Sequence, residues 1–168
     1  CASYTPTQYD LSTPFGQEKN GYRSENLEAQ TFPDASFDLV VTQDVFEHLF
    51  DPAAAIKEIA RTLKPGGLYV MTVPILNKDR PTRRRASLLD GEVVMHGPVE
   101  YHGNPISGEG SLVTMDWGYD IADFLFQHSG MFTTLCFTDD ILRGIRAEYI
   151  EVVVCRKPSA DSSQIVPN

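Results

Sequence analysis

The chain has 168 residues, of which 42% are hydrophobic and 22% are charged, and its formal net charge is −9 at pH 7. This length is enough for one domain with a hydrophobic core. The acidic balance argues against broad nucleic-acid binding, which needs a basic face, and no apolar run approaches the roughly 20 residues that cross a bilayer. We therefore expect a globular protein with neither nucleic acid nor membrane as a partner.

The first third of the chain predicts irregular structure followed by a strand. Residues 1–20 are rich in Thr, Ser, Pro and Gly, which is typical of irregular structure. Residues 21–24 are compatible with a short strand and residues 25–31 with a loop or a helical turn. Phe37 to Thr42 is an almost continuous apolar run. It predicts a strand covered on both faces, as in a parallel sheet.

A helix is predicted directly after this strand. Asp51 can cap its first turn, and Pro52 takes the first helical position, where the missing N–H costs nothing. Ile56 and Ile59 recur at helical spacing, which indicates one buried face. Because the residue before a proline avoids the helical region, Pro65 should end the helix near position 63 or 64.

The elements that follow predict a βαβ unit and an antiparallel end. Gly66 and Gly67 indicate a turn, and residues 68–73 a second buried strand, which gives a right-handed parallel crossover. Residues 75–118 are rich in Pro, Gly, Arg and His, with weak periodicity, and predict a long functional excursion at one end of the sheet. A helix over 119–129, stopped by Gly130, precedes strands over 131–137 and 147–155.

We expect one domain over residues 1–157, with the excursion at 75–118 on the substrate side and a flexible tail at 158–168. Cys1, Cys136 and Cys155 lack the spacing of metal ligands. Cys136 and Cys155 lie in apolar runs and are expected to be buried free thiols, which favours a reducing, cytoplasmic location. The sequence leaves the oligomeric state open and is compatible with a homo-oligomer.

Three motifs within Glu25–Pro74 occur in a characteristic order. They are Glu25-Asn26-Leu27 with Phe32-Pro33, then FDLVVTQDVFEHLFDP, then EIARTLKPGGLYVMTVP. Together they resemble the class I S-adenosylmethionine-dependent methyltransferases, in particular the broad type 11 group. The resemblance implies an α/β, Rossmann-like and mostly parallel sheet with helices on both faces and an antiparallel C-terminal strand pair.

The resemblance also implies where S-adenosylmethionine would bind. In such enzymes the loop after the third strand packs on the adenine, and here that loop is Glu25, Asn26 and Leu27. The segment after the fourth strand follows the methionine part of the cofactor, and here it is Gln43, Asp44 and Val45, with Glu47 and His48 behind.

The position of Gln43 and Asp44 gives independent support for this placement. Ligands of open parallel sheets lie beyond the carboxyl ends of the strands. A carboxylate and backbone carbonyls at such an end suit an ammonium or sulfonium group. His48 is either a cofactor contact or a helix-start histidine bonded to a neighbouring group, and Glu47 is expected to be structural.

The family's glycine-rich opening is not found in this sequence. The motif GxGxG should follow a first strand, but Gly16 and Gly21 are far apart and follow no predicted strand. We expect an incomplete domain, truncated at its N-terminal side, because the missing strands 1 and 2 of the family order 3-2-1-4-5-7-6 would lie between the strands present. Alternatively, residues 1–4 end strand 2 of a longer product, or another chain fills the gap.

The excursion supplies the candidate catalytic residues. A His or carboxylate base helps to deprotonate an oxygen acceptor, so His102 is the candidate base, assisted by Glu100 or His96; a solvated loop is the alternative. His96 and His102 are only two potential ligands, so no metal site is expected.

The same excursion begins with a cluster of cationic side chains, which are Lys78, Arg80, Arg83, Arg84 and Arg85. It indicates either an anionic acceptor or a mobile, solvated loop. Trp117 and Tyr119 are expected to wall the acceptor pocket or to lie in the core.

The sequence therefore predicts an S-adenosylmethionine-dependent methyltransferase acting on a small or medium acceptor, with oxygen favoured as the methylated atom. The first alternative is a binding or regulatory domain that keeps the fold without turnover, which the missing glycine turn favours. The second is a nicotinamide-dependent enzyme on a similar sheet, which would need a G-x-G-x-x-G after a strand.

Overall fold

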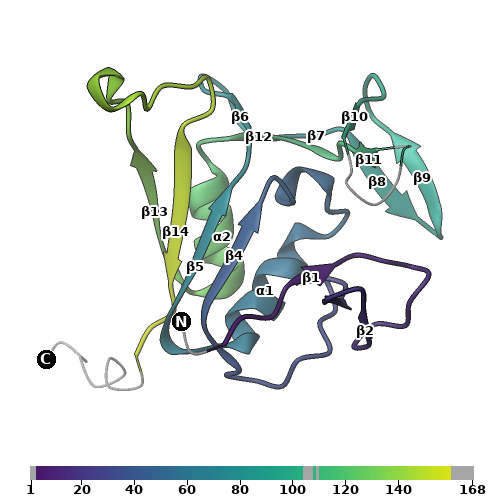
Figure 1. Cartoon of the computed structure of the whole chain (residues 1–168). Helices are drawn as coiled ribbons and strands as arrows, with labels where there is room; N and C mark the ends of the chain where they lie inside the picture. The colour runs from purple at the N-terminus through teal and green to yellow at the C-terminus, as the bar shows by residue number, and fades with distance from the viewer. Residues whose placement is uncertain (1–2, 104–107, 109, 160–168) are drawn as a thin grey trace, which may run out of the picture.

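A four-stranded sheet forms the centre of the computed structural model, which describes residues 3–103, 108 and 110–159 (Figure 1). Its strands are β4 (Phe37–Gln43), β5 (Leu63–Thr72), β13 (Phe132–Phe137) and β14 (Glu151–Arg156), in the order β13-β14-β5-β4. Strands β4 and β5 are parallel, and the other two pairings are antiparallel. The predicted βαβ unit and the antiparallel C-terminal pair are confirmed.

Helix α1 (Pro52–Thr62) connects the two parallel strands, as predicted. The Asp51 carboxylate accepts a hydrogen bond of 2.9 Å from the Ala54 N–H, so the predicted cap is present. The chain then enters β5 directly at Leu63 rather than through a separate turn. Residues 64–67 instead bulge out, because Phe37 pairs with Leu63 whereas Leu39 pairs with Leu68.

Helix α2 (Ile121–Ser129) packs against α1, on the same face of the sheet (Figure 1). Gly130 terminates α2 with φ +69°, as the sequence predicted. The two helices and this face enclose one core, whose largest fully buried side chains include Trp117, Tyr69, Phe46, Ile56, Ile59, Met71, Ile121 and Leu125. Trp117 is thus a core residue rather than a pocket wall.

The opposite face of the sheet is open, and here the sequence prediction was wrong. Leu39 and Val41 on β4 are 53% and 63% exposed, whereas Phe37–Thr42 was expected to be covered on both faces. The apolar run was read correctly as a strand, but both helices described lie on one side of it. Within the described ranges the sheet therefore differs from the expected arrangement of helices on both faces, and one of its three pairings is parallel.

The open face also explains a second wrong expectation. Cys155 on β14 is buried, but Cys136 on β13 is exposed. Cys136 pairs with Val152 of β14. Because alternate residues of a strand point to opposite faces, Cys136 falls on the uncovered side and Cys155 on the core side.

A small separate sheet precedes β4. It consists of β1 (Thr7–Gln8), β2 (Glu18–Lys19) and β3 (Tyr22–Ser24), in the order β1-β3-β2. The predicted short strand over 21–24 is confirmed. Asp10 holds this unit together by accepting hydrogen bonds from Ser12, Thr13, Lys19 and Tyr22.

The segment 75–118 contains seven short strands. They are β6 (Ile75–Asn77), β7 (Arg83–Arg84), β8 (Ala86–Leu89), β9 (Glu92–Met95), β10 (Tyr101–His102), β11 (Ser111–Leu112) and β12 (Met115–Gly118). The β8–β9 hairpin projects away from the main sheet (Figure 1). The chain between β11 and β12 contacts the short helix η1 (Phe46–His48). There the Thr114 N–H donates to the Glu47 carbonyl at 2.7 Å.

A second short helix, η2 (Ile141–Arg143), connects β13 and β14. None of the helices in the described ranges is long and apolar enough to span a bilayer. The end of the predicted tail, residues 160–168, lies outside the described residues.

Candidate functional site

The parallel strands end at an exposed acidic corner. Asp44 follows β4 with φ +51°, a conformation that few residues other than glycine adopt. Its N–H donates to the Thr72 carbonyl at 3.1 Å, and its Oδ1 accepts from Thr72 Oγ1 at 3.2 Å. Gln43 and Asp44 are both exposed. This corner therefore presents a carboxylate at the edge where ligands of parallel sheets bind.

A buried carboxylate lies immediately behind this corner. Glu47 is only 2% exposed, and neither of its carboxylate oxygens has a hydrogen-bond partner among the described residues. Burial, with a contribution from Asp44, raises the pKa of Glu47 from 4.5 to about 7. From the sequence Glu47 was expected to be structural. A buried carboxylate with a raised pKa and no hydrogen-bond donor is, however, typical of functional sites.

Two histidines from distant parts of the chain flank Glu47. His48 Nε2 lies 3.8 Å from Glu47 Oε1, and His102 Nδ1 lies 3.7 Å from the same oxygen. The rings of His48 and His102 are perpendicular, with centroids 5.1 Å apart. Glu100 approaches His102 from the other side, at 3.6 Å from Nε2. The predicted pair of His102 and Glu100 is thus brought to Glu47, whereas His96 lies elsewhere, with its Nε2 2.8 Å from Ser87 Oγ.

His48 is held by a backbone group that the sequence did not indicate. Its Nδ1 lies 2.9 Å from the Leu112 carbonyl on β11, and not against a neighbouring group of η1. Because a carbonyl only accepts hydrogen bonds, Nδ1 must carry the proton and Nε2 is left with its lone pair. Burial lowers the pKa of His48 and keeps the imidazole neutral.

The arginines of the excursion are engaged by protein groups. Arg83 and Arg85 both bind the buried Asp116, at 2.7 and 3.1 Å, and Arg85 also binds Glu100 at 2.7 Å. Arg84 donates to the Phe50 carbonyl. These contacts fix β7, β12 and Glu100 relative to one another and therefore hold the excursion over η1.

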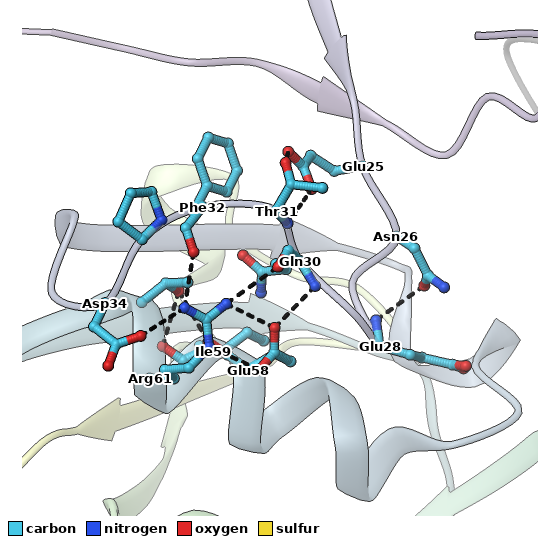
Figure 2. A network of polar contacts seen from close by, with 12 residues as sticks. Glu25, Asn26, Glu28, Gln30, Thr31, Phe32, Asp34, Glu58, Ile59 and Arg61 are labelled. Carbon is cyan, nitrogen blue, oxygen red and sulfur yellow. Dashed lines mark hydrogen bonds and ion pairs between the residues drawn. The ribbon is translucent and has the colours of Figure 1, made fainter. Parts of the chain in front are cut away.

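The predicted adenine loop is built differently from the acidic corner (Figure 2). Glu25 is buried, and its carboxylate accepts from the Thr31 N–H at 2.9 Å and from Arg23 Nε at 2.7 Å. The Asn26 side chain accepts from the Glu28 N–H at 3.0 Å, which closes a local turn. Leu27 packs against the core. The Glu25 carboxylate is thus already bonded to protein groups.

The two depressions described on the surface lie away from the acidic corner. One, of about 400 Å³, is lined by Glu28, Ala29, Gln30, Ala54, Lys57 and Glu58. The other, of about 200 Å³, is lined by residues of the N-terminal unit. Glu58, which lines the first depression, forms an ion pair with Arg61, which also pairs with Asp34 (Figure 2). Neither includes Gln43, Asp44 or Val45.

Comparison with known proteins finds similarity to methyltransferases over part of the chain. The family model described as "Methyltransferase domain" matches residues 3–71. The chain is 44% identical over 52 residues to a probable S-adenosylmethionine-dependent methyltransferase of Mycolicibacterium smegmatis, which covers 31% of this chain and 20% of the relative. It is 30% identical over 121 residues to a ubiquinone biosynthesis O-methyltransferase of Caulobacter vibrioides, covering 54% and 47% of the two chains.

A solved structure supports the fold. A SAM-dependent methyltransferase from Methanosarcina mazei superposes with a TM-score of 0.53 and 16% identity, over 92% of this chain and 82% of that one. The matches to the two curated relatives span less than half of the length of each. The Rossmann-like α/β fold expected from the sequence is confirmed, and residues 3–71 are similar to the methyltransferase domain of S-adenosylmethionine-dependent methyltransferases.

Proposed function

We propose that this chain is part of an S-adenosylmethionine-dependent methyltransferase that methylates an oxygen atom of a small or medium acceptor. One observation carries the proposal. The acidic corner at Asp44, where the parallel strands end, lies directly before the buried group formed by Glu47 and His102. A site for a cationic cofactor and a candidate proton acceptor are therefore adjacent.

The residues at the corner fit the cofactor in part. When bound, S-adenosylmethionine supplies an electrophilic methyl group on a sulfonium. Asp44, with Gln43 and Val45, would hold the positively charged methionine portion through its carboxylate and backbone groups. Asn26, Leu27 and the backbone of Glu25 would contact the adenine, since the Glu25 carboxylate is already bonded. His48 would support this site from behind.

The acceptor would be activated by His102. As a neutral imidazole it takes the proton of the acceptor hydroxyl at Nε2, the nitrogen that faces Glu100. Glu47, when ionised, stabilises the resulting imidazolium from the Nδ1 side. Most of the remaining rate enhancement comes from holding the acceptor oxygen in line with the methyl group.

The choice of oxygen rests on this base and on the similarity to an O-methyltransferase. The cation cluster is weak support for an anionic acceptor, because Arg83 and Arg85 already bind Asp116. The acidic net charge and the free thiol of Cys155 support a cytoplasmic location without nucleic acid as a partner. A homo-oligomer remains compatible with the exposed face of β4.

A second function, a binding or regulatory domain without turnover, is favoured by one observation. The Asp44 corner is exposed and can hold a cationic ligand whether or not His102 acts as a base. Such a domain would bind the cofactor at the acidic corner and would leave His102 without a catalytic role.

Calorimetry with S-adenosylmethionine, together with release of S-adenosylhomocysteine in the presence of a panel of hydroxylated aromatic compounds, separates these functions. Binding and turnover support the enzyme, and binding without turnover supports the regulatory domain. Asp44→Asn keeps the backbone conformation accessible and should weaken binding by about tenfold, as the loss of one charge-assisted contact implies. Asp38→Asn, at the other end of β4, is the matched control. Absence of binding in the folded chain would refute both functions.

A further inference from the structure

Glu47, His48 and His102 form a compact group of three potential metal ligands. One ligand atom from each lies within 4.8 Å of the others. Glu47 and His48 belong to η1, whereas His102 belongs to β10, so the group exists only because the excursion returns over η1. From the sequence, His96 and His102 were two potential ligands and the position of Asp116 in space was open, so no metal site was expected.

The Glu47 carboxylate has no hydrogen-bond donor among the described residues. A buried carboxylate normally accepts several hydrogen bonds, and burying one without them costs free energy. Both oxygens of Glu47 lie in the interior without a donor among the described residues. The imidazole nitrogens of His102 and His48 lie 3.7 and 3.8 Å from Glu47 Oε1, beyond hydrogen-bond range. A cation between these three side chains would satisfy the carboxylate.

Both histidines are oriented as metal ligands are. In metal sites, a ligating imidazole typically donates its second N–H to a carbonyl or a carboxylate, which fixes its tautomer. His48 donates from Nδ1 to the Leu112 carbonyl and turns Nε2 toward Glu47. His102 turns Nδ1 toward Glu47 and has Glu100 3.6 Å from Nε2. Glu100 is itself held by Arg85 at 2.7 Å.

The distances allow a tetrahedral ion after the ligands draw together. Ligand bonds of about 2.0–2.1 Å place neighbouring ligands about 3.3–3.4 Å apart in a tetrahedron. The separations of 3.7 and 3.8 Å between Glu47 and the two imidazoles exceed this by a few tenths of an ångström, and all three ligand atoms lie within 4.8 Å of one another. Side-chain rotation of this size is available to His102, whose side chain is 36% exposed. Two imidazoles and one carboxylate suit Zn²⁺ and related ions better than Mg²⁺ or Ca²⁺.

We propose that Glu47, His48 and His102 bind one divalent transition-metal ion of the Zn²⁺ class, with Glu100 orienting His102. Three protein ligands leave the fourth position of a tetrahedral ion open to water. The inference concerns binding alone and does not depend on methyl transfer. A metal on His102 Nδ1 leaves the N–H of the neutral imidazole on Nε2, which then cannot take a proton from an acceptor, so metal-loaded and metal-free protein are separate states of the site.

Titration of the metal-free chain with CoCl₂ tests the proposal, because tetrahedral Co²⁺ absorbs visible light. We expect one Co²⁺ per chain and its displacement by ZnCl₂. Glu47→Gln and His102→Gln should each lower the affinity at least about tenfold, and Glu100→Gln by about tenfold or more, as for other partners of a ligating histidine. Circular dichroism confirms that each variant is folded.

His96→Gln and His128→Gln are matched controls, because they remove the other two of the four histidines. Both variants should bind Co²⁺ as the parent chain does. Folded parent chain that takes up no stoichiometric Co²⁺ would refute the site. Unchanged affinity in Glu47→Gln and His102→Gln would do the same, since the metal would then be bound elsewhere.

Discussion

Two buried glutamates at the same edge of the main sheet have opposite properties. Glu151 begins β14, next to Val152, which pairs with Thr72 where the parallel strands end. Glu47 lies just beyond the end of β4. Glu151 is 3% exposed and Glu47 is 2% exposed, so they are buried equally. Their partners differ, because both carboxylate oxygens of Glu151 accept hydrogen bonds, whereas those of Glu47 have no donor among the described residues.

The engagement of Glu151 is specific. Lys78 Nζ lies 2.9 Å from its Oε1, the Tyr119 hydroxyl donates to the same oxygen at 3.2 Å, and the Ile150 N–H donates to Oε2 at 3.0 Å. Burial alone would raise the pKa of Glu151, but Lys78 and the backbone donors outweigh it and leave this pKa lowered. At Glu47 burial prevails, and the pKa rises. Partners, and not depth, therefore decide whether a buried carboxylate is structural or reactive.

The largest loss of stability is expected from Arg85, which binds Glu100 and Asp116. Arg85→Ala leaves Asp116, which is 5% exposed, without its buried partner, and should destabilise the fold by about 3–5 kcal/mol. Urea unfolding at pH 7 measures this. Arg83 contacts the same carboxylate, but its side chain is 62% exposed, so Arg83→Ala should cost less than about 1 kcal/mol. Equal losses in the two variants would contradict the importance of burial.

Glu47→Gln should stabilise the metal-free protein, and more so at higher pH. Between pH 4.5 and about 7 the unfolded chain loses the Glu47 proton while the folded chain keeps it, so this group makes stability fall as pH rises. Above pH 7 the cost is complete, at about 3 kcal/mol. Urea unfolding with a chelator at pH 5 and pH 8 should show that the gain from Glu47→Gln is larger at pH 8.

The exposed Glu100 gives the control for this pH dependence. Its side chain is 45% exposed and pairs with Arg85 at 2.7 Å, so Glu100→Gln removes a paired carboxylate and should not stabilise the chain as Glu47→Gln does. If Glu47→Gln destabilises the chain equally at both values, the carboxylate has a partner that the present geometry does not contain.

A smaller effect is expected from removing the partner of Glu151. Lys78→Met leaves this carboxylate without its cation and should destabilise the fold at neutral pH, by less than Arg85→Ala does because the Lys78 side chain is 44% exposed. The lowered pKa of Glu151 stabilises the fold above its unfolded pKa, and this contribution is lost as pH falls. The variant should therefore approach the parent in acid. Thermal unfolding from pH 3 to 7, with the exposed Lys57→Met on α1 as control, measures this difference.

Local signals made the βαβ unit predictable. Asp51 and Pro52 start α1, the glycines near position 66 relieve the crowded entry to β5, and Gly130 ends α2. Each acts through contacts within a few residues, so no knowledge of distant segments is needed. The excursion lacked such signals, because its strands are two to four residues long and its polar side chains pair across the fold.

The candidate site was predictable only in part. Asp44 could be placed from its position after a strand, and His102 from its chemistry. The contact of His102 with Glu47, and that of His48 with the Leu112 carbonyl, join segments whose approach no local pattern encodes.

The sequence by itself determined the βαβ unit, the ends of both α-helices and the resemblance to methyltransferases, because periodicity, capping residues and short motifs act locally. The tertiary structure alone decided which face of the sheet is open, which carboxylate is left without a partner, and that two histidines meet one glutamate. These properties depend on how distant segments pack, and packing sets the burial and the partners that fix the chemistry of an ionisable group.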